Sequence, residues 1–177
     1  NYPSNMLYSA MLSAISELYD LPELSKKAEK IRETVYYQSF DGKFFRDHAV
    51  RENGILKTKS DSTEVCQYYA FFFGIATPER NGELFEILLH KFGPERNRDT
   101  DYPEIAPANA FIGNYLRLEI LMRAGFKEDA LKNIVGFFGY MADRTGTLWE
   151  NIDTGASCNH CFASYVICWL EKLKNII

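Results

Sequence analysis

The hydrophobic residues of this 177-residue chain recur at three- and four-residue steps along most of its length. That spacing places them on one side of an α-helix, whereas a half-buried strand would show strict alternation. In residues 4–19, the apolar stripe consists of Leu7, Met11, Ala14, Ile15 and Leu18. The sequence therefore predicts an all-α fold with about seven helices.

The order of the predicted helices contains a repeat. Strongly apolar helices begin near residues 4, 62, 107 and 158, and each of the first three is followed by a more polar, amphipathic helix. A period of about 45 to 60 residues is typical of arrays of helical hairpins. In such an array the apolar helices form an inner layer that the amphipathic helices cover. We therefore expect three hairpins and one closing helix.

Capping and turn residues mark the boundaries of these elements. Ser4 is placed to cap the first helix, and Thr77-Pro78 is placed to start the fourth. Residues 41–60 interrupt the helical period with DG and NG turn signals around short alternating runs. That pattern suits a small hairpin or an irregular loop.

Composition and charge argue against two classes of partner. The net charge is -4 and the two signs are intermixed, so there is no basic stripe of the kind that binds nucleic acid. No apolar run approaches the length that spans a bilayer, which argues against a membrane partner. The 13 Phe and 11 Tyr are expected instead in the core or on a ligand-binding surface.

Four cysteines lie in or beside apolar helical patterns: Cys66, Cys158, Cys161 and Cys168. Buried free thiols are the first interpretation, and they favour the cytoplasm slightly over an oxidising compartment. A zinc site is the alternative, because His160 lies between two of these cysteines. No second cysteine pair follows within reach, so we expect neither a metal nor a cofactor.

The predicted inner helices share a second property, which is that each begins with polar side chains. These are Ser4-Asn5, Thr63-Glu64, Asn109 and Asn159-His160. Helix capping explains any one of them. Four at one end of a helical layer would also line a polar mouth, and such a mouth, rimmed by aromatic rings, is where a carbohydrate would bind.

The segment GTLWENID, residues 146–153, contains the most informative acid, Glu150. One interpretation is a loop glutamate that is exposed or caps the next helix. The other is a general base, whose carboxylate takes a proton from water as that water attacks a substrate. In the second case Trp149 would shield the site and offer a flat face to a sugar, and His160 would donate to a sugar hydroxyl.

Several segments resemble the catalytic domain of bacterial α-L-rhamnosidases of glycoside hydrolase family 78. They are PSNMLYSAMLSAISELY, TEVCQYYAFFFGIATPER, ANAFIGNYLRLEILMRAG and, above all, GTLWENID followed by SCNHCFASYVICWL. The resemblance covers essentially the whole chain. It implies an (α/α)6 barrel of six helical hairpins, and residues 1–177 would be a single partial domain from the second half of that barrel, without the N-terminal hairpins.

The resemblance also implies an activity, the inverting hydrolysis of terminal α-L-rhamnosides. Glu150 would be the general base, His160 would bind the sugar, and Trp149 and Asn159 would flank them. Inversion needs a second carboxyl group at about 6.5–9.5 Å. The family's general acid comes from earlier hairpins that this chain lacks, and nothing in the sequence around Glu64 or Glu104 marks either as a proton donor. We therefore expect the chain alone to be inactive.

Half a barrel would leave apolar edges of its inner helices exposed, for example in CQYYAFFFGI. We therefore expect self-association or pairing with the missing half of the barrel. Two other functions fit the helical repeat. One is a non-catalytic repeat module that binds a partner along a concave face. The other is a different six-hairpin glycosidase, for example one that acts on uronic-acid sugars.

Overall fold

Helices make up 57% of the structure, a computed structural model that describes residues 1–153 and 155–175. The α-helices are α1 (Tyr2–Tyr19), α2 (Pro22–Ser39), α3 (Glu64–Phe72), α4 (Gly82–His90), α5 (Phe111–Arg123), α6 (Lys127–Ile134), α7 (Tyr140–Thr145) and α8 (Ile167–Leu173). A π-helical stretch, η1 (Val135–Gly139), joins α6 to α7, and a 3₁₀ helix, η2 (Cys161–Val166), leads into α8. The all-α prediction is confirmed.

The contacts within the chain define two compact units. Unit 1 consists of Asn1–His90 with Pro103–Ala106, and unit 2 of Lys91–Tyr102 with Pro107–Ile177. That residues 1–177 form one partial domain stays a prediction. Among the described residues, no helix has the length and apolar character needed to cross a membrane.

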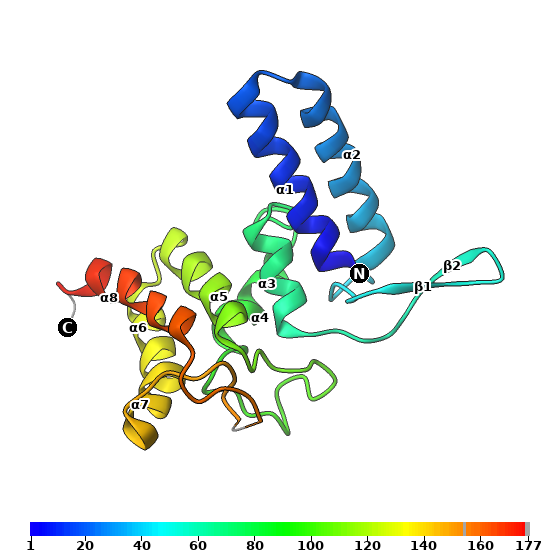
Figure 1. Cartoon of the computed structure of the whole chain (residues 1–177). Helices are drawn as coiled ribbons and strands as arrows, with labels where there is room; N and C mark the ends of the chain where they lie inside the picture. The colour runs from blue at the N-terminus through cyan, green and yellow to red at the C-terminus, as the bar shows by residue number, and fades with distance from the viewer. Residues whose placement is uncertain (154, 176–177) are drawn as a thin grey trace. The chain divides into compact units, whose positions relative to one another are not determined.

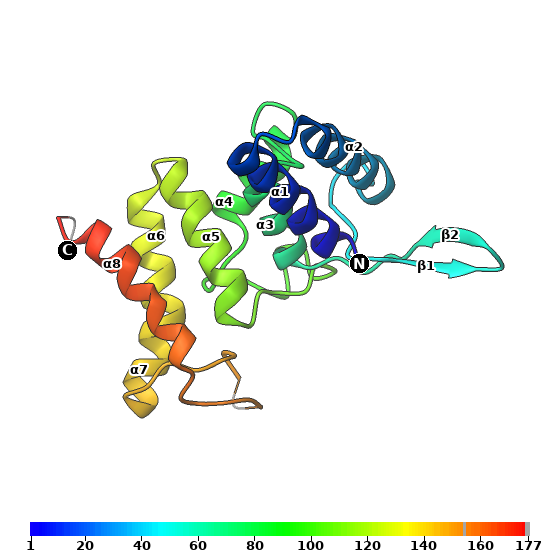
Figure 2. The same cartoon turned by 45° about the horizontal axis from the view of Figure 1, so that its top comes forward.

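In unit 1, α1 and α2 lie side by side as an antiparallel hairpin (Figures 1 and 2). The Asn1 side chain caps α1 by accepting from the Ser4 N–H at 3.1 Å, so the prediction that Ser4 is the cap was wrong. α1 buries Met6 and Leu12, whereas the predicted stripe of Leu7, Met11 and Leu18 is 48%, 46% and 74% exposed. Both faces of this helix are apolar, and the face that carries Met6 and Leu12 is the one that packs into the core.

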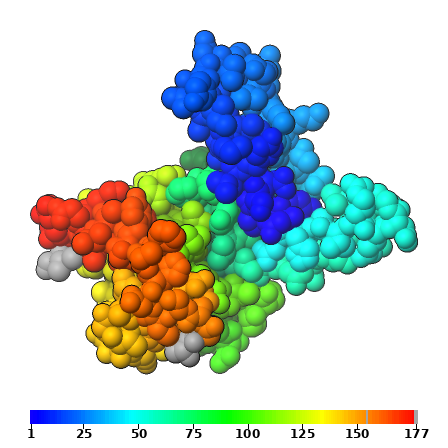
Figure 3. Space-filling view, viewed as in Figure 1, coloured from blue at the N-terminus to red at the C-terminus, as the bar shows by residue number. Residues whose placement is uncertain are grey.

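Of the two alternatives for residues 41–60, a small hairpin or an irregular loop, the structure contains the hairpin, between α2 and α3. β1 (Ala49–Glu52) and β2 (Ile55–Thr58) pair antiparallel, with Glu52 opposite Ile55. Asn53 and Gly54 form the turn between them, both with positive φ, as the NG signal predicts. The hairpin protrudes from unit 1 as an arm, drawn in cyan in Figure 3.

The second hairpin of unit 1 consists of α3 and α4. Thr63 caps α3 through its side chain, which accepts from the Cys66 N–H. The predicted start of the next helix at Thr77-Pro78 was wrong, because residues 77–81 form a turn and α4 begins at Gly82. CQYYAFFFGI is mostly buried or half-buried, so the apolar side chains that remain exposed lie elsewhere.

Unit 2 contains the third hairpin, α5 with α6, and α8 lies alongside α6 (Figure 2). Gly125 makes the tight turn of this hairpin with a φ of +85°. The predicted closing helix begins later than expected, because η2 starts at Cys161 and residues 157–160 precede it in irregular structure. Three successive pairs of helices and a last helix follow one another along the chain. Their arrangement as a layered array of hairpins stays a prediction.

Candidate functional site

The loop that carries Glu150 lies between two other segments of unit 2. On one side, the Glu150 carbonyl accepts from the Phe111 N–H at 3.2 Å, and the Ile152 N–H donates to the Asn109 carbonyl at 2.7 Å. On the other side, the Glu150 N–H donates to the Ser157 carbonyl at 2.8 Å. The backbone of Glu150 is thus held from both sides.

The Glu150 side chain is half-buried. Within the described part of the chain, its carboxylate has no hydrogen-bond or ion-pair partner. It differs in this from acids that are tied to basic neighbours, such as Glu52, which pairs with Lys57 and Lys59. A carboxylate on a fixed backbone and without such a partner can accept a proton from water.

Trp149 anchors the loop to α7. It is 2% exposed, its indole Nε1 donates to Thr145 Oγ1 at 2.8 Å, and its backbone N–H donates to Met141 Sδ at 3.3 Å. Tyr140 meets the indole ring edge-on at 6.0 Å between centroids. Because the ring lies in the core of unit 2, it supports Glu150 rather than offering a free face to a sugar.

His160 occupies the cap position of η2 in an extended conformation, so it precedes the helix instead of lying in its first turn. Its N–H donates to the Leu148 carbonyl at 2.8 Å, which joins it to the Glu150 segment. Its ring lies 4.9 Å from Phe111 and 5.6 Å from Phe162, centroid to centroid. The imidazole Nδ1 is buried and has no hydrogen-bond partner among the described residues. Asn159 beside it is exposed.

Phe111 is therefore the residue where the two predicted site positions meet. Its N–H bonds to Glu150, and its ring contacts His160. The sequence analysis did not single it out. A signal was available, because Phe111 follows the polar helix start at Asn109 and begins a helix that is rich in apolar residues.

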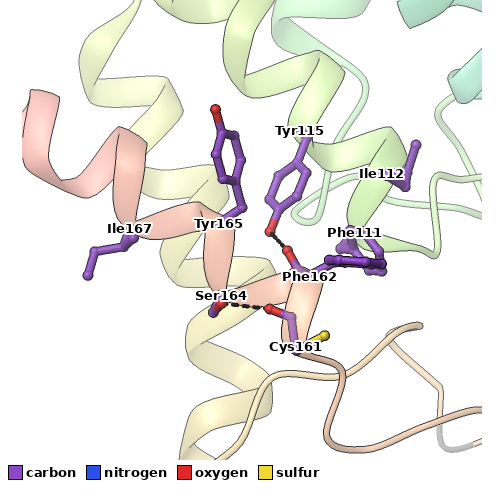
Figure 4. Close-up of a pocket in the computed structure, with 8 residues that line it drawn as sticks. All are labelled: Phe111, Ile112, Tyr115, Cys161, Phe162, Ser164, Tyr165 and Ile167. Carbon is purple, nitrogen blue, oxygen red and sulfur yellow. Dashed lines mark hydrogen bonds between the residues drawn. The ribbon is translucent and has the colours of Figure 1, made fainter.

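Phe111 and Phe162, the two rings that contact His160, line an open pocket of about 420 Å³, which is shown in Figure 4. The lining of this pocket also includes Ile112, Tyr115, Tyr165 and Ile167. The Tyr115 hydroxyl lies 2.7 Å from the Phe162 carbonyl and 2.6 Å from that of Ala163, to which it donates. Burial raises the pKa of Tyr115 above its ordinary value, so this hydroxyl stays protonated and holds the start of η2.

A second pocket, of about 400 Å³, adjoins the Glu150 loop. It is bordered by Ile152 and Asp153 from the loop, by Phe137 and Tyr140, and by the segment that carries Arg98. Charged groups of both signs thus reach this pocket, and a polar ligand would find partners there.

The polar residues that begin the predicted inner helices lie close together in two groups, one in each unit. In unit 1, Asn1, Ser4, Asp47 and Thr63 line a pocket of about 340 Å³. In unit 2, Asn109 and His160 flank the Glu150 segment. That all four starts share one mouth stays a prediction. Glu64, 1% exposed and bonded to the Tyr68 hydroxyl at 2.9 Å, and the exposed Glu104 both belong to unit 1.

The four cysteines differ in exposure. All are free thiols; Cys66 is buried, Cys158 and Cys168 are half-buried, and Cys161 is exposed. The prediction of buried thiols is confirmed for Cys66 and was wrong for Cys161, because η2 turns that side chain outward. Among residues 1–153 and 155–175, no group of three or more His, Cys, Asp or Glu could hold a metal ion.

No family model matches this chain, and neither a curated protein nor a solved structure shows significant similarity to it.

Proposed function

We propose that this chain is part of a glycoside hydrolase in which Glu150 is the general base. The observation that carries the proposal is how Glu150 is held by its neighbours. Its backbone is bonded on both sides, and its carboxylate has no partner among the described residues. A general base needs this combination, because it must hold one water molecule at a fixed place and keep its lone pairs available.

We also propose a terminal α-L-rhamnoside as the substrate and inversion as the stereochemical outcome. This part rests on the resemblance of GTLWENID and SCNHCFASYVICWL to family 78. His160 would donate to a sugar hydroxyl, with the unburied side of its ring toward the ligand. Asn159, exposed beside it, would add a second polar contact. Trp149 would act by holding the loop.

The general acid would come from outside this chain. Inversion needs two carboxyl groups about 6.5–9.5 Å apart, and unit 2 supplies the one that activates water. We propose that the chain represents the second half of an (α/α)6 barrel and is inactive until it pairs with the first half.

Exposed apolar side chains support the pairing. α1 exposes Leu7, Met11 and Leu18, and the region around η2 exposes Phe162, Tyr165 and Ile167. Surfaces of this kind are covered in most soluble proteins. They would serve equally well in a non-catalytic repeat module, and an activity assay separates the two functions.

The test is hydrolysis of a chromogenic α-L-rhamnoside by the full-length gene product. We expect Glu150→Gln to lower kcat by about 10²–10⁴-fold, the usual contribution of general-base catalysis. Glu128→Gln, a change at an exposed acid on α6, is the matched control and should keep wild-type activity. A comparable rate for wild type and Glu150→Gln would refute the assignment.

One observation favours a second substrate class. Arg98 lines the pocket beside Ile152 and Asp153, and a basic residue there suits the carboxylate of a uronic-acid sugar. Assay of a matched uronide and rhamnoside decides between them. Arg98→Gln should reduce hydrolysis of the uronide selectively if the acidic sugar is the substrate.

A further inference from the structure

Three polar residues form a buried chain of hydrogen bonds between α5 and α6. Asn114, Arg117 and Asn133 are 2%, 5% and 3% exposed. The Arg117 Nε donates to Asn133 Oδ1 at 3.0 Å, and the Asn133 Nδ2 donates to Asn114 Oδ1 at 3.3 Å. Buried polar groups cost free energy unless they are bonded, so a chain of three needs a reason beyond packing.

The guanidinium of Arg117 fixes the direction of every bond in the chain. Arginine can only donate, so Asn133 must turn its oxygen toward Arg117 and its NH₂ toward Asn114. Asn114 must in turn face Asn133 with its oxygen. The NH₂ group of Asn114 must then point away from Arg117, toward the N-terminal end of α5.

At that end the Asn114 NH₂ meets the backbone that holds the Glu150 loop. Asn114 Nδ2 lies 3.1 Å from the Ala110 carbonyl and 3.5 Å from the Ala108 carbonyl, to which it donates. Ala110 forms an antiparallel bridge with Asn151, and the residues on either side of Ala110 bond to Ile152 and Glu150. The chain thus begins at a buried cation and ends on the segment that carries the loop.

We propose that Arg117, Asn133 and Asn114 are positioning residues for Glu150. They fix the 108–111 segment, and that segment fixes the backbone of Glu150. The catalytic meaning of this relay rests on the proposed function, but the mechanical link between the relay and the loop does not.

Two isosteric variants break the relay at different points. Asn114→Asp places a carboxylate oxygen against the Ala110 carbonyl, which repels it. Asn133→Asp keeps a partner for Arg117 and so preserves the buried cation. It forces Asn114 to turn its NH₂ toward the new carboxylate and its oxygen toward the backbone carbonyls. The link to the loop is lost in both variants.

Amide hydrogen exchange on the full chain tests the link. In both variants the N–H groups of Phe111 and Ile152 should exchange about tenfold faster or more relative to Leu121, inside α5, which reports general loosening of unit 2. Asn81→Asp, at a buried asparagine of unit 1 whose NH₂ donates to the Tyr36 hydroxyl, should leave this ratio unchanged. Asn133→Asp decides the question if Asn114→Asp does not fold. Equal changes at Phe111, Ile152 and Leu121 would overturn the proposal.

Kinetics on the full-length gene product test the catalytic meaning. Asn133→Asp should lower kcat about tenfold or more with little change in KM, because the sugar contacts remain while the base is displaced. A loosened loop together with full activity of Glu150→Gln would reject Glu150 as the base and leave the relay as a loop anchor. An unchanged exchange ratio would reject the relay whatever the activity.

Discussion

Phe111 and His160 lie with their ring centroids 4.9 Å apart and their planes tilted by 40°. The backbone N–H of the same phenylalanine donates to the Glu150 carbonyl at 3.2 Å. One residue at the start of α5 therefore touches both members of the candidate site, by its ring and by its backbone.

Phe111→Leu separates these two contacts. The backbone bond to Glu150 is kept, whereas the ring pair with His160 is lost, at a cost of about 0.5–1.5 kcal/mol beyond the change in buried area. We expect the His160 ring signals to shift in NMR spectra and the affinity for L-rhamnose, the sugar of the proposed substrate, to fall. Phe85→Leu removes a comparable ring pair with Phe71 in unit 1 and should leave the His160 signals in place. Unchanged His160 signals in Phe111→Leu would contradict the contact.

Gly93→Ala should be more harmful than the similar change Gly125→Ala. Both glycines have positive φ, +107° and +85°, so an alanine costs about 1–2 kcal/mol at either position. A Cβ at Gly93 would also lie 2.8 Å from Arg117 Nε, whereas one at Gly125 would meet nothing within 4 Å. Urea denaturation should show a larger loss for Gly93→Ala. Equal losses would mean that the Arg117 side chain moves freely.

Asp41 should contribute to stability in a pH-dependent way. Burial raises the pKa of its carboxyl, but the N–H groups of Phe44 and Lys43 and the Arg46 guanidinium outweigh burial and hold the pKa below its ordinary value. A carboxyl whose pKa is lower in the folded state stabilises the fold above its unfolded-state pKa. That contribution is lost as pH falls through the folded-state pKa.

The free energy of unfolding, measured by urea denaturation, should therefore decrease as pH falls below about 4. Asp41→Asn should lose part of this dependence. Glu33→Gln, at an exposed acid on α2, is the control and should follow the wild type. The same slope in Asp41→Asn as in the wild type would show that Asp41 takes no part.

Alkylation should distinguish the cysteines. Cys161 is exposed and should react first with iodoacetamide. Burial, followed by the charge and hydrogen bond of Asp47, raises the pKa of Cys66 well above its ordinary value, so little of the reactive thiolate forms there. Mass spectrometry of peptides from native and urea-unfolded protein measures the order. Labelling of Cys66 at the rate of Cys161 in the native protein would contradict it.

Helix identity was predictable because it depends on local pattern, and the NG turn signal put a β-hairpin among the two alternatives for residues 41–60. The stripe that packs in α1 was not predictable, because Met6 and Leu12 are as apolar as Leu7 and Met11, and partner helices decide between them. The start of α4 was misplaced for a related reason. Thr77-Pro78 has the chemistry of a helix start, but Asn81 donates to the Tyr36 hydroxyl, a contact that local sequence does not reveal.

At the candidate site, sequence reasoning singled out Glu150 and His160 but not what connects them. Phe111 and the buried relay depend on side chains from α5 and α6, which are distant in sequence. A signal was present, since Asn114 and Arg117 are polar residues three positions apart on a helix that is rich in apolar residues. Spacing alone could not name Asn133 as their partner.

The π-helical stretch η1 sets the rotational phase of α7. A π turn contains about one residue more than an α turn, so α7 is rotated by about 100° from a straight continuation of α6. The face so presented carries Tyr140, Met141 and Thr145, which meet Trp149. Deletion of one residue from η1 would restore a regular helix and turn that face away. The Glu150 loop would then lose its support without any change in its own sequence.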